Sequence, residues 1–251
     1  MLLVNADNIR LAATILLLRD SSEGPEVFML QRPGGGDFPD LHVFPGGKVD
    51  TQDHVPDQVR GLDDPGASVQ LGLAEGGLRF WAAAIRECFE ECGVLLAYRG
   101  AELVRFDDPG EAARFEDYRE QLIDGSLSLE TLCRLEGLTL ATDQVHYFSH
   151  WITPEQAPRR FDTRFFIAAM PGGQETLAHA WETAADAWVR PVQALAAHRE
   201  GRWQMISPTL TTLASIESFS RVSDILQAVR REAHLPMLTD ALRSQGMHDL
   251  R

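Results

Sequence analysis

The stretch from Arg86 to Val94 constrains the fold of this chain more than any other segment. On a helix, the spacing of Glu87, Glu90 and Glu91 would place all three carboxylates on one face, about one turn tall. The opposite face carries an apolar stripe, formed by Trp81, Ile85, Cys88 and Cys92. Gly93 favours a left-handed helix end. The sequence therefore predicts a helix over residues 75–92 that buries its apolar side in a core and points an acidic cluster outward.

This acidic cluster has two interpretations. Glutamate-rich helix faces are usually solvated surface. Carboxylate clusters are also the oxygen ligands that hard cations such as Mg²⁺ prefer, and that use would offset the repulsion between like charges. The upstream segment Phe44-Pro45-Gly46-Gly47 favours the second interpretation, because a short apolar strand runs into a double glycine whose backbone can turn tightly and approach a ligand.

Together these segments resemble the signature of the Nudix hydrolases, G-x5-E-x7-R-E-U-x-E-E-x-G-U, where U is a bulky apolar residue. The first half matches at Gly47, and the second half matches at Arg86, Glu87, Glu90, Glu91, Gly93 and Val94. Two features depart from the pattern. Asp53 stands where the pattern has glutamate, and 32 residues separate Asp53 from Arg86, so an extra 25 residues split the box.

Further similarity points to one subgroup of the family. Residues 28–31, residues 42–47 and Asp50 resemble the Nudix enzymes that include a peroxisomal CoA diphosphatase, a subgroup that also carries an insertion within the box. Residues 159–166 resemble one of its strands, and Trp188 resembles the tryptophan before the final helix of many Nudix domains. Gly36 and Asp40 occupy the places where the CoA-pyrophosphatase motif has an arginine and a glycine.

The resemblance implies an α/β/α sandwich with a mixed sheet, formed by a single Nudix domain over residues 1–251. Residues 51–75 would be an insertion within the box, residues 101–140 a helical insertion, and residues 205–251 a set of C-terminal helices. The residue patterns predict strands over 9–19, 27–32, 94–97, 144–152, 161–170 and 187–189. They predict further helices over 111–123, 127–135, 191–198, 209–231 and 236–244.

If the two halves of the box meet, the resemblance implies a metal site. The Gly46 or Gly47 carbonyl, with Glu87, Glu90 and Glu91, would hold one or more Mg²⁺ or Mn²⁺ ions. A carboxylate would accept a proton from the water that attacks one phosphorus of a diphosphate. Arg86 is expected to brace the carboxylates, Glu90 at i+4 in particular, rather than to bind substrate.

Other residues are candidates with weaker support from the sequence. Glu182, six residues before Trp188, would be a further metal ligand or a solvated loop residue. Either Asp53 or Glu75 would brace Arg86. The candidate substrate contacts, which are also explained as surface cations or as ion-pair partners of Asp162, are Arg32, Lys48, Arg160 and Arg164. His146 and His150 fall in a strand-like stretch, where their spacing indicates packing rather than a metal pair.

Composition excludes several classes of protein. A net charge of −14 argues against nucleic acid as a partner, because binding to it needs clustered lysine and arginine. There is no run of about 18 apolar residues, so no membrane span is expected. Residues 1–10 lack the pattern of a secretory signal. Three cysteines make neither a disulfide framework nor a zinc site, which is typical of a protein of the reducing cytoplasm.

The function expected is metal-dependent hydrolysis of the diphosphate bond in a nucleoside diphosphate linked to another group. The subgroup resemblance favours CoA or acyl-CoA, while ADP-ribose, NADH and nucleotide sugars remain open. The rival hypothesis is a Nudix-like sensor that binds a nucleotide without cleaving it. The intact Glu87, Glu90 and Glu91 argue against a sensor, whereas Asp53 and the split box argue for it. The helices over 111–135 would cap the cleft or form a homodimer surface.

Overall fold

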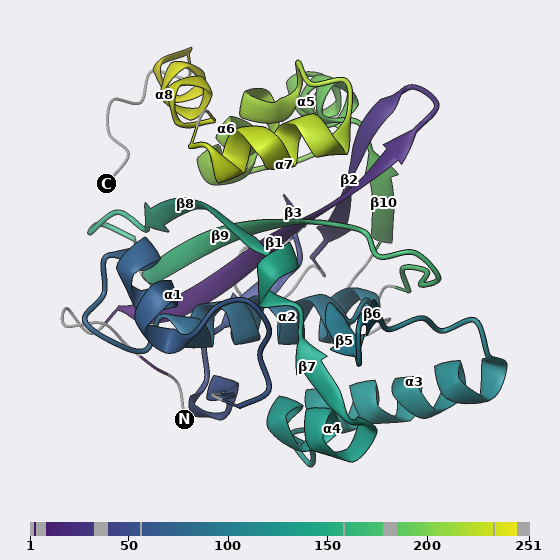
Figure 1. Cartoon of the computed structure of the whole chain (residues 1–251). Helices are drawn as coiled ribbons and strands as arrows, with labels where there is room; N and C mark the ends of the chain where they lie inside the picture. The colour runs from purple at the N-terminus through teal and green to yellow at the C-terminus, as the bar shows by residue number, and fades with distance from the viewer. Residues whose placement is uncertain are drawn as a thin grey trace.

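The computed structural model describes residues 3, 9–32, 40–55, 57–157, 159–177, 185–232 and 234–244. A seven-stranded sheet with the order β10-β2-β1-β9-β8 lies at its centre, and β3 and β4 pair with β2 and β1 (Figure 1). Because β1 runs parallel to β9 and antiparallel to β2 and β4, the sheet is mixed, as predicted. The strands are β1 (Arg10–Ser21), β2 (Gly24–Gln31), β3 (His42–Val43), β4 (Gly46–Lys48), β8 (His146–Ile152), β9 (Phe161–Ala169) and β10 (Ala185–Val189).

Alternate residues of β1 enter two different cores, because successive side chains of a strand point to opposite faces. Ile15 and Leu17 pack on the face covered by α2 (Leu78–Cys92). Leu16 and Leu18 pack on the other face, against the C-terminal helices (Figure 1). These helices are α5 (Pro191–Arg199), α6 (Ser207–Ile216), α7 (Val222–Arg230) and α8 (Leu235–Ser244). The predicted α/β/α sandwich is confirmed.

The apolar stripe of α2 is buried as predicted, and each of Trp81, Ile85, Cys88 and Cys92 is at most 1% exposed. The Trp81 indole N–H donates to the Val145 carbonyl at 2.8 Å, which satisfies its one polar group. The helix begins at Leu78 rather than at residue 75. Gly76 adopts a positive φ of 79°, and Asp64 accepts hydrogen bonds from the Gly76 and Leu78 N–H groups, so the chain turns before the helix starts.

Both insertions contain ordered elements. The box insertion holds η1 (Thr51–Asp53) and α1 (Asp64–Leu71). The second insertion holds α3 (Pro109–Ile123) and α4 (Leu129–Glu136), close to the two helices predicted there. A small sheet of order β6-β5-β7 joins them to the body of the fold, and it consists of β5 (Ala97–Arg99), β6 (Glu102–Leu103) and β7 (Leu138–Leu140). A short 3-10 helix, η2 (Thr142–Gln144), leads into β8.

Two sequence-based predictions differ from these elements. The strand predicted over 94–97 overlaps β5 only at Ala97, because the position of β5 is set by its pairing with β6 and β7 rather than by local propensity. The region predicted as helical over 209–231 is broken between α6 and α7, where the Val222 N–H donates to the Asp20 side chain instead of to a preceding turn. Among the described helices, none is both long enough and apolar enough to cross a membrane.

The packing of α7 against β8 predicts a loss of stability in acid. Burial first, and the charge of Arg230 second, lower the pKa of His146 to about 4, and its Nε2 accepts a hydrogen bond from Arg230. The unfolded chain gains a proton at His146 below about pH 6.5, whereas the folded chain does not until about pH 4, so this contribution is lost as the pH falls. Urea unfolding should show a midpoint that drops less between pH 7 and pH 5 in His146→Gln than in the unmodified protein. Equal drops in the two proteins would contradict this assignment.

Candidate active site

Two glycines of β4 lie directly against the acidic face of α2. The Gly46 N–H donates to Glu91 Oε2 at 2.7 Å. A Cβ atom at Gly47 would overlap the Glu87 carboxylate, so glycine is required there to leave room for that side chain. The pairing of Gly47 with Ala13 of β1 holds β4 in this position. The two halves of the split box therefore meet in space, although an insertion separates them in the sequence.

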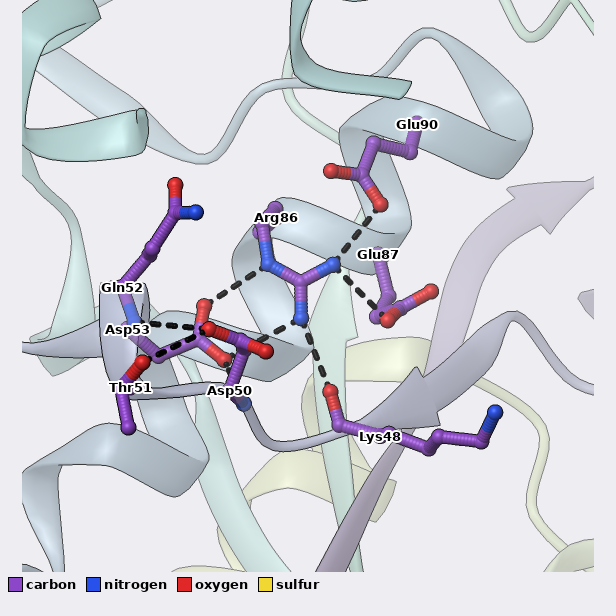
Figure 2. A network of polar contacts seen from close by, with 8 residues as sticks. All are labelled: Lys48, Asp50, Thr51, Gln52, Asp53, Arg86, Glu87 and Glu90. Atoms are coloured by element: carbon purple, nitrogen blue, oxygen red, sulfur yellow. Dashed lines mark hydrogen bonds and ion pairs between the residues drawn. The ribbon is translucent and has the colours of Figure 1, made fainter. Parts of the chain in front are cut away.

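The Arg86 guanidinium lies at the centre of the site (Figure 2). Its Nε and Nη2 donate to the two carboxylate oxygens of Asp53 at 2.7 and 3.1 Å. Its Nη1 donates to Glu87 and Glu90, each at 2.8 Å, and Nη2 also donates to the Lys48 carbonyl at 2.9 Å. Since a guanidinium has five N–H donors, all of them are used. The prediction that Arg86 braces the carboxylates is confirmed by these contacts.

Asp53 takes the place of the pattern's glutamate in bracing Arg86. Its side chain is fully buried, and Oδ2 also accepts a hydrogen bond from the Asp50 N–H at 2.7 Å. That bond closes a capping box around η1, which brings the shorter aspartate side chain close to the guanidinium. The alternative brace, Glu75, is exposed on the segment before α2 and does not contact Arg86, so that alternative is wrong.

The acidic cluster is covered rather than pointed outward, which corrects the sequence-based expectation. Glu90 is only 9% exposed, and β4 covers Glu87 and Glu91. Burial, followed by the charge of Glu87, raises the pKa of Glu91 well above its usual range. Burial also raises the pKa of Glu90 to about 8, although Arg86 opposes the shift. Burial alone would lower the pKa of Arg86, but the surrounding carboxylates outweigh it and raise the pKa.

This electrostatic arrangement distinguishes the site from a solvated helix face. Carboxylates are normally kept in water because removing their charge from water is costly. Here Arg86 contacts Asp53, Glu87 and Glu90, while Glu91 has the Gly46 N–H and the nearby positive charge of Arg32. The clustered, partly uncompensated carboxylates favour an additional cation.

The other candidate residues are placed differently. Arg32 lies near enough to Glu91 to lower its pKa, and Lys48 contributes its carbonyl to the site while its exposed side chain points away from Arg86 (Figure 2). Arg164 is buried and paired with Asp162, and Arg160 donates to the Thr153 carbonyl. These two arginines therefore have partners within the protein. Asp162 also accepts from His150 at 2.7 Å, so this histidine packs as predicted.

The ligand set predicted for a metal ion is only partly visible. Glu182 lies outside the described residues. Among those described, no three acidic, histidine or cysteine side chains are arranged so that they could hold a metal ion as they stand. Arg86 instead occupies one oxygen each of Glu87 and Glu90, and Gly46 occupies one oxygen of Glu91. In donor chemistry, however, three clustered carboxylates beside a glycine backbone fit a hard divalent cation.

Arg119 is a residue of the site that sequence reasoning missed. It is 1% exposed, and it extends from α3 to donate to the Glu90 carbonyl at 2.9 Å and to the Leu177 carbonyl at 2.7 Å. The cation thus lies at the C-terminal end of α2, where the helix dipole favours positive charge. The sequence does contain a signal for this role, because Arg119 lies on the same face of α3 as the apolar residues Phe115 and Leu122, and α3 buries that face.

Residues 73–216, more than half of the chain, match the family model described as the NUDT19 Nudix domain. The chain belongs to the Nudix hydrolase family. The expected resemblance to the split-box subgroup is thereby confirmed. The match includes α2 with all its glutamates, while Gly46, Gly47 and Asp53 lie before it.

The chain is similar to two curated proteins of this family. It is 26% identical over 238 residues to acyl-coenzyme A diphosphatase NUDT19 of Gallus gallus, covering 80% of this chain and 63% of that protein. It is 25% identical over 242 residues to the Homo sapiens protein of the same name, covering 81% and 64%. The chain thus spans less than two thirds of the length of these relatives.

A solved structure supports the fold. The chain is similar to a NUDIX hydrolase from Alicyclobacillus acidocaldarius with a TM-score of 0.68 and 24% identity, over 87% of this chain and 96% of that one. This likeness supports the architecture of the fold.

The buried contacts of Arg119 predict that it stabilises the protein. Arg119→Met would leave the Glu90 and Leu177 carbonyls without their donor, so the free energy of unfolding should fall by roughly 3 kcal/mol. Urea unfolding measures the change. The control is Arg134→Met on the exposed surface of α4, which should change stability by less than about 0.5 kcal/mol. Similar values for both variants would show that Arg119 does not have this role.

Proposed function

We propose that this protein is a metal-dependent hydrolase of the diphosphate bond in a nucleoside diphosphate linked to another group. The observation that carries the proposal is the closure of the split box, in which Gly46 and Gly47 meet Glu91 and Glu87 while Arg86 braces Glu87 and Glu90. Family membership agrees with this reaction class.

The proposed metal ligands are Glu87, Glu90 and Glu91, the carbonyl of Gly46 or Gly47, and Glu182. Mg²⁺ or Mn²⁺ bound there would neutralise negative charge on the diphosphate and make a bound water more acidic. The raised pKa values of Glu90 and Glu91 support this assignment, since the burial that disfavours their negative charge also favours the binding of a cation.

The residues of the chain itself position the reaction. Arg86 fixes the Glu87 and Glu90 carboxylates, and the Gly46 N–H fixes Glu91. One of these carboxylates accepts a proton from water as the water oxygen attacks one phosphorus. The bond from that phosphorus to the bridging oxygen breaks, and each product carries one of the two phosphates. Arg32 and Lys48 are proposed phosphate contacts. Arg160 and Arg164 would contact the substrate only by releasing their present partners, the Thr153 carbonyl and the Asp162 carboxylate.

The favoured substrate is CoA or an acyl-CoA. This proposal depends on two relatives named acyl-coenzyme A diphosphatase NUDT19, which are 26% and 25% identical to this chain. ADP-ribose, NADH and nucleotide sugars remain alternatives. Gly36, one of the two departures from the CoA motif, lies outside the described residues. The other, Asp40, has a positive φ of 58°, a conformation that glycine adopts more readily.

The sensor alternative loses both of its supports. Asp53 departs from the pattern, but it makes the bidentate contact with Arg86 that a bracing carboxylate must make. The substitution therefore does not disable the brace. The split box does not separate the two halves in space either. A nucleotide sensor would also have no need for all of the clustered glutamates.

The decisive experiment is a substrate panel. The protein would be incubated with Mg²⁺ or Mn²⁺ and with CoA, acetyl-CoA, ADP-ribose, NADH or a diadenosine polyphosphate, and released monophosphates would be measured. Glu90→Gln should lower kcat by at least about 100-fold, because a carboxylate of the cluster is lost. Glu130→Gln, an exposed change on α4, should retain full activity.

Two results would reject parts of this proposal. Tight binding of one compound without turnover of any would reject the enzyme and favour the sensor. Turnover that survives Glu90→Gln unchanged would reject the assigned site while leaving the reaction class in place.

The close approach of β4 to α2 predicts a second effect. Gly47→Ala adds a methyl group where the Glu87 carboxylate lies, so the carboxylate must move and activity should fall by about tenfold or more. Gly172→Ala is the matched control, since its added Cβ would meet only Arg105 at an ordinary 3.6 Å. Circular dichroism would confirm that both variants fold. Full activity in folded Gly47→Ala would show that the position of Glu87 does not matter.

A further inference from the structure

A pocket lies beside the beginning of α2, away from the acidic cluster. Its volume is about 280 Å³, at the small end for ligand pockets. Its walls come from the starts of β1 and β9, from Val49 after β4, and from the segment that leads into α2. Most of the lining is apolar and is supplied by Leu3, Leu11, Val49, Leu73 and Phe80. Arg79 and Arg164 are the two cations among its described lining residues.

Both arginines have an unused donor. Arg164 is only 4% exposed, and its Nη1 is paired with Asp162, but its buried Nε–H has no acceptor among the residues that the structure describes. The buried Nε–H of Arg79 also has no acceptor, and within the described part of the chain Arg79 forms no ion pair. Buried donors are nearly always satisfied in folded proteins, so these two show that both guanidinium groups beside the pocket are incompletely paired.

The pocket is separate from the proposed catalytic site. Arg79 lies two turns before Arg86 along the same stripe of α2. Arg86 donates hydrogen bonds to Asp53 and to the Lys48 carbonyl. Val49, the residue after Lys48, lines the pocket. Arg86, Asp53 and the Lys48 carbonyl therefore lie between the pocket and the acidic cluster.

We propose that this pocket binds a small monocarboxylate with a short apolar chain. Guanidinium groups make their strongest hydrogen bonds to ionised oxygen acceptors, and a carboxylate offers two oxygens to the two arginines that line the pocket. The apolar walls suit an aliphatic or aromatic tail. Asp162, the nearby acid, is neutralised by Arg164 and contacts His150, while Glu75 is exposed to solvent at the pocket. Arg79 therefore supplies the uncompensated positive charge.

The test uses hexanoate as the probe and does not depend on the proposed catalytic activity. [1-13C]Hexanoate would be titrated with the whole protein at neutral pH and followed by NMR, with hexan-1-ol and hexylammonium as probes of equal length. Hexanoate should bind at least tenfold more tightly than either. Arg79→Met should weaken hexanoate binding by at least about tenfold, the loss expected for a charge-assisted hydrogen bond. Arg134→Met, with the same change of charge on the α4 surface, should bind it normally.

Three results would overturn the proposal. They are no hexanoate binding up to about 10 mM, equal binding of hexan-1-ol, and equal binding by Arg79→Met and Arg134→Met. If Arg79→Met does not fold, Arg79→Lys supplies the same comparison, because lysine keeps the charge but lacks the Nε–H donor.

Discussion

The Arg86 guanidinium joins α2 to the segment from Lys48 to Asp53, which lies far before it in the sequence. It holds Asp53 from the box insertion, the Lys48 carbonyl after the double glycine, and two glutamates of its own helix. All five of its donors are used, so a change in any one segment would leave a buried charged group short of a partner. Together with the pairing of β4 with β1 and the hydrogen bond from the Gly46 N–H to Glu91, this side chain fixes β4 against α2 and so shapes the acidic site.

The second insertion fixes the other end of the same helix. Arg119 of α3 donates to the Glu90 carbonyl, and Gly93 ends the helix beside it with a positive φ of 71°. The Leu177 N–H donates to Cys92, while the Leu177 carbonyl accepts from Arg119. The helix that carries the carboxylates is thus held at its middle by Arg86 and at its end by Arg119. Each insertion contributes to the support of the site, in addition to any role at its surface.

Much of the candidate site was predictable because it follows from helical spacing. The i, i+4 pair Arg86 and Glu90 and the buried stripe from Trp81 to Cys92 depend on local geometry that the sequence specifies directly. The sequence left open whether Asp53 or Glu75 braces Arg86. These two residues lie at opposite ends of the box insertion, and the choice between them depends on how the insertion folds. The contact of Glu87 and Glu91 with β4 was missed because β4 arrives from a distant part of the chain.

The sequence by itself determined the carboxylate helix, the strand pattern of the sheet and the family, because these depend on spacings of a few residues and on a recognisable pattern. Only the tertiary structure decided that Gly47 meets Glu87, that Arg119 supports Glu90, and that Arg79 and Arg164 line one pocket. These contacts form between residues separated by many positions. Their geometry is set by sheet register and by the packing of whole elements, which no local pattern encodes.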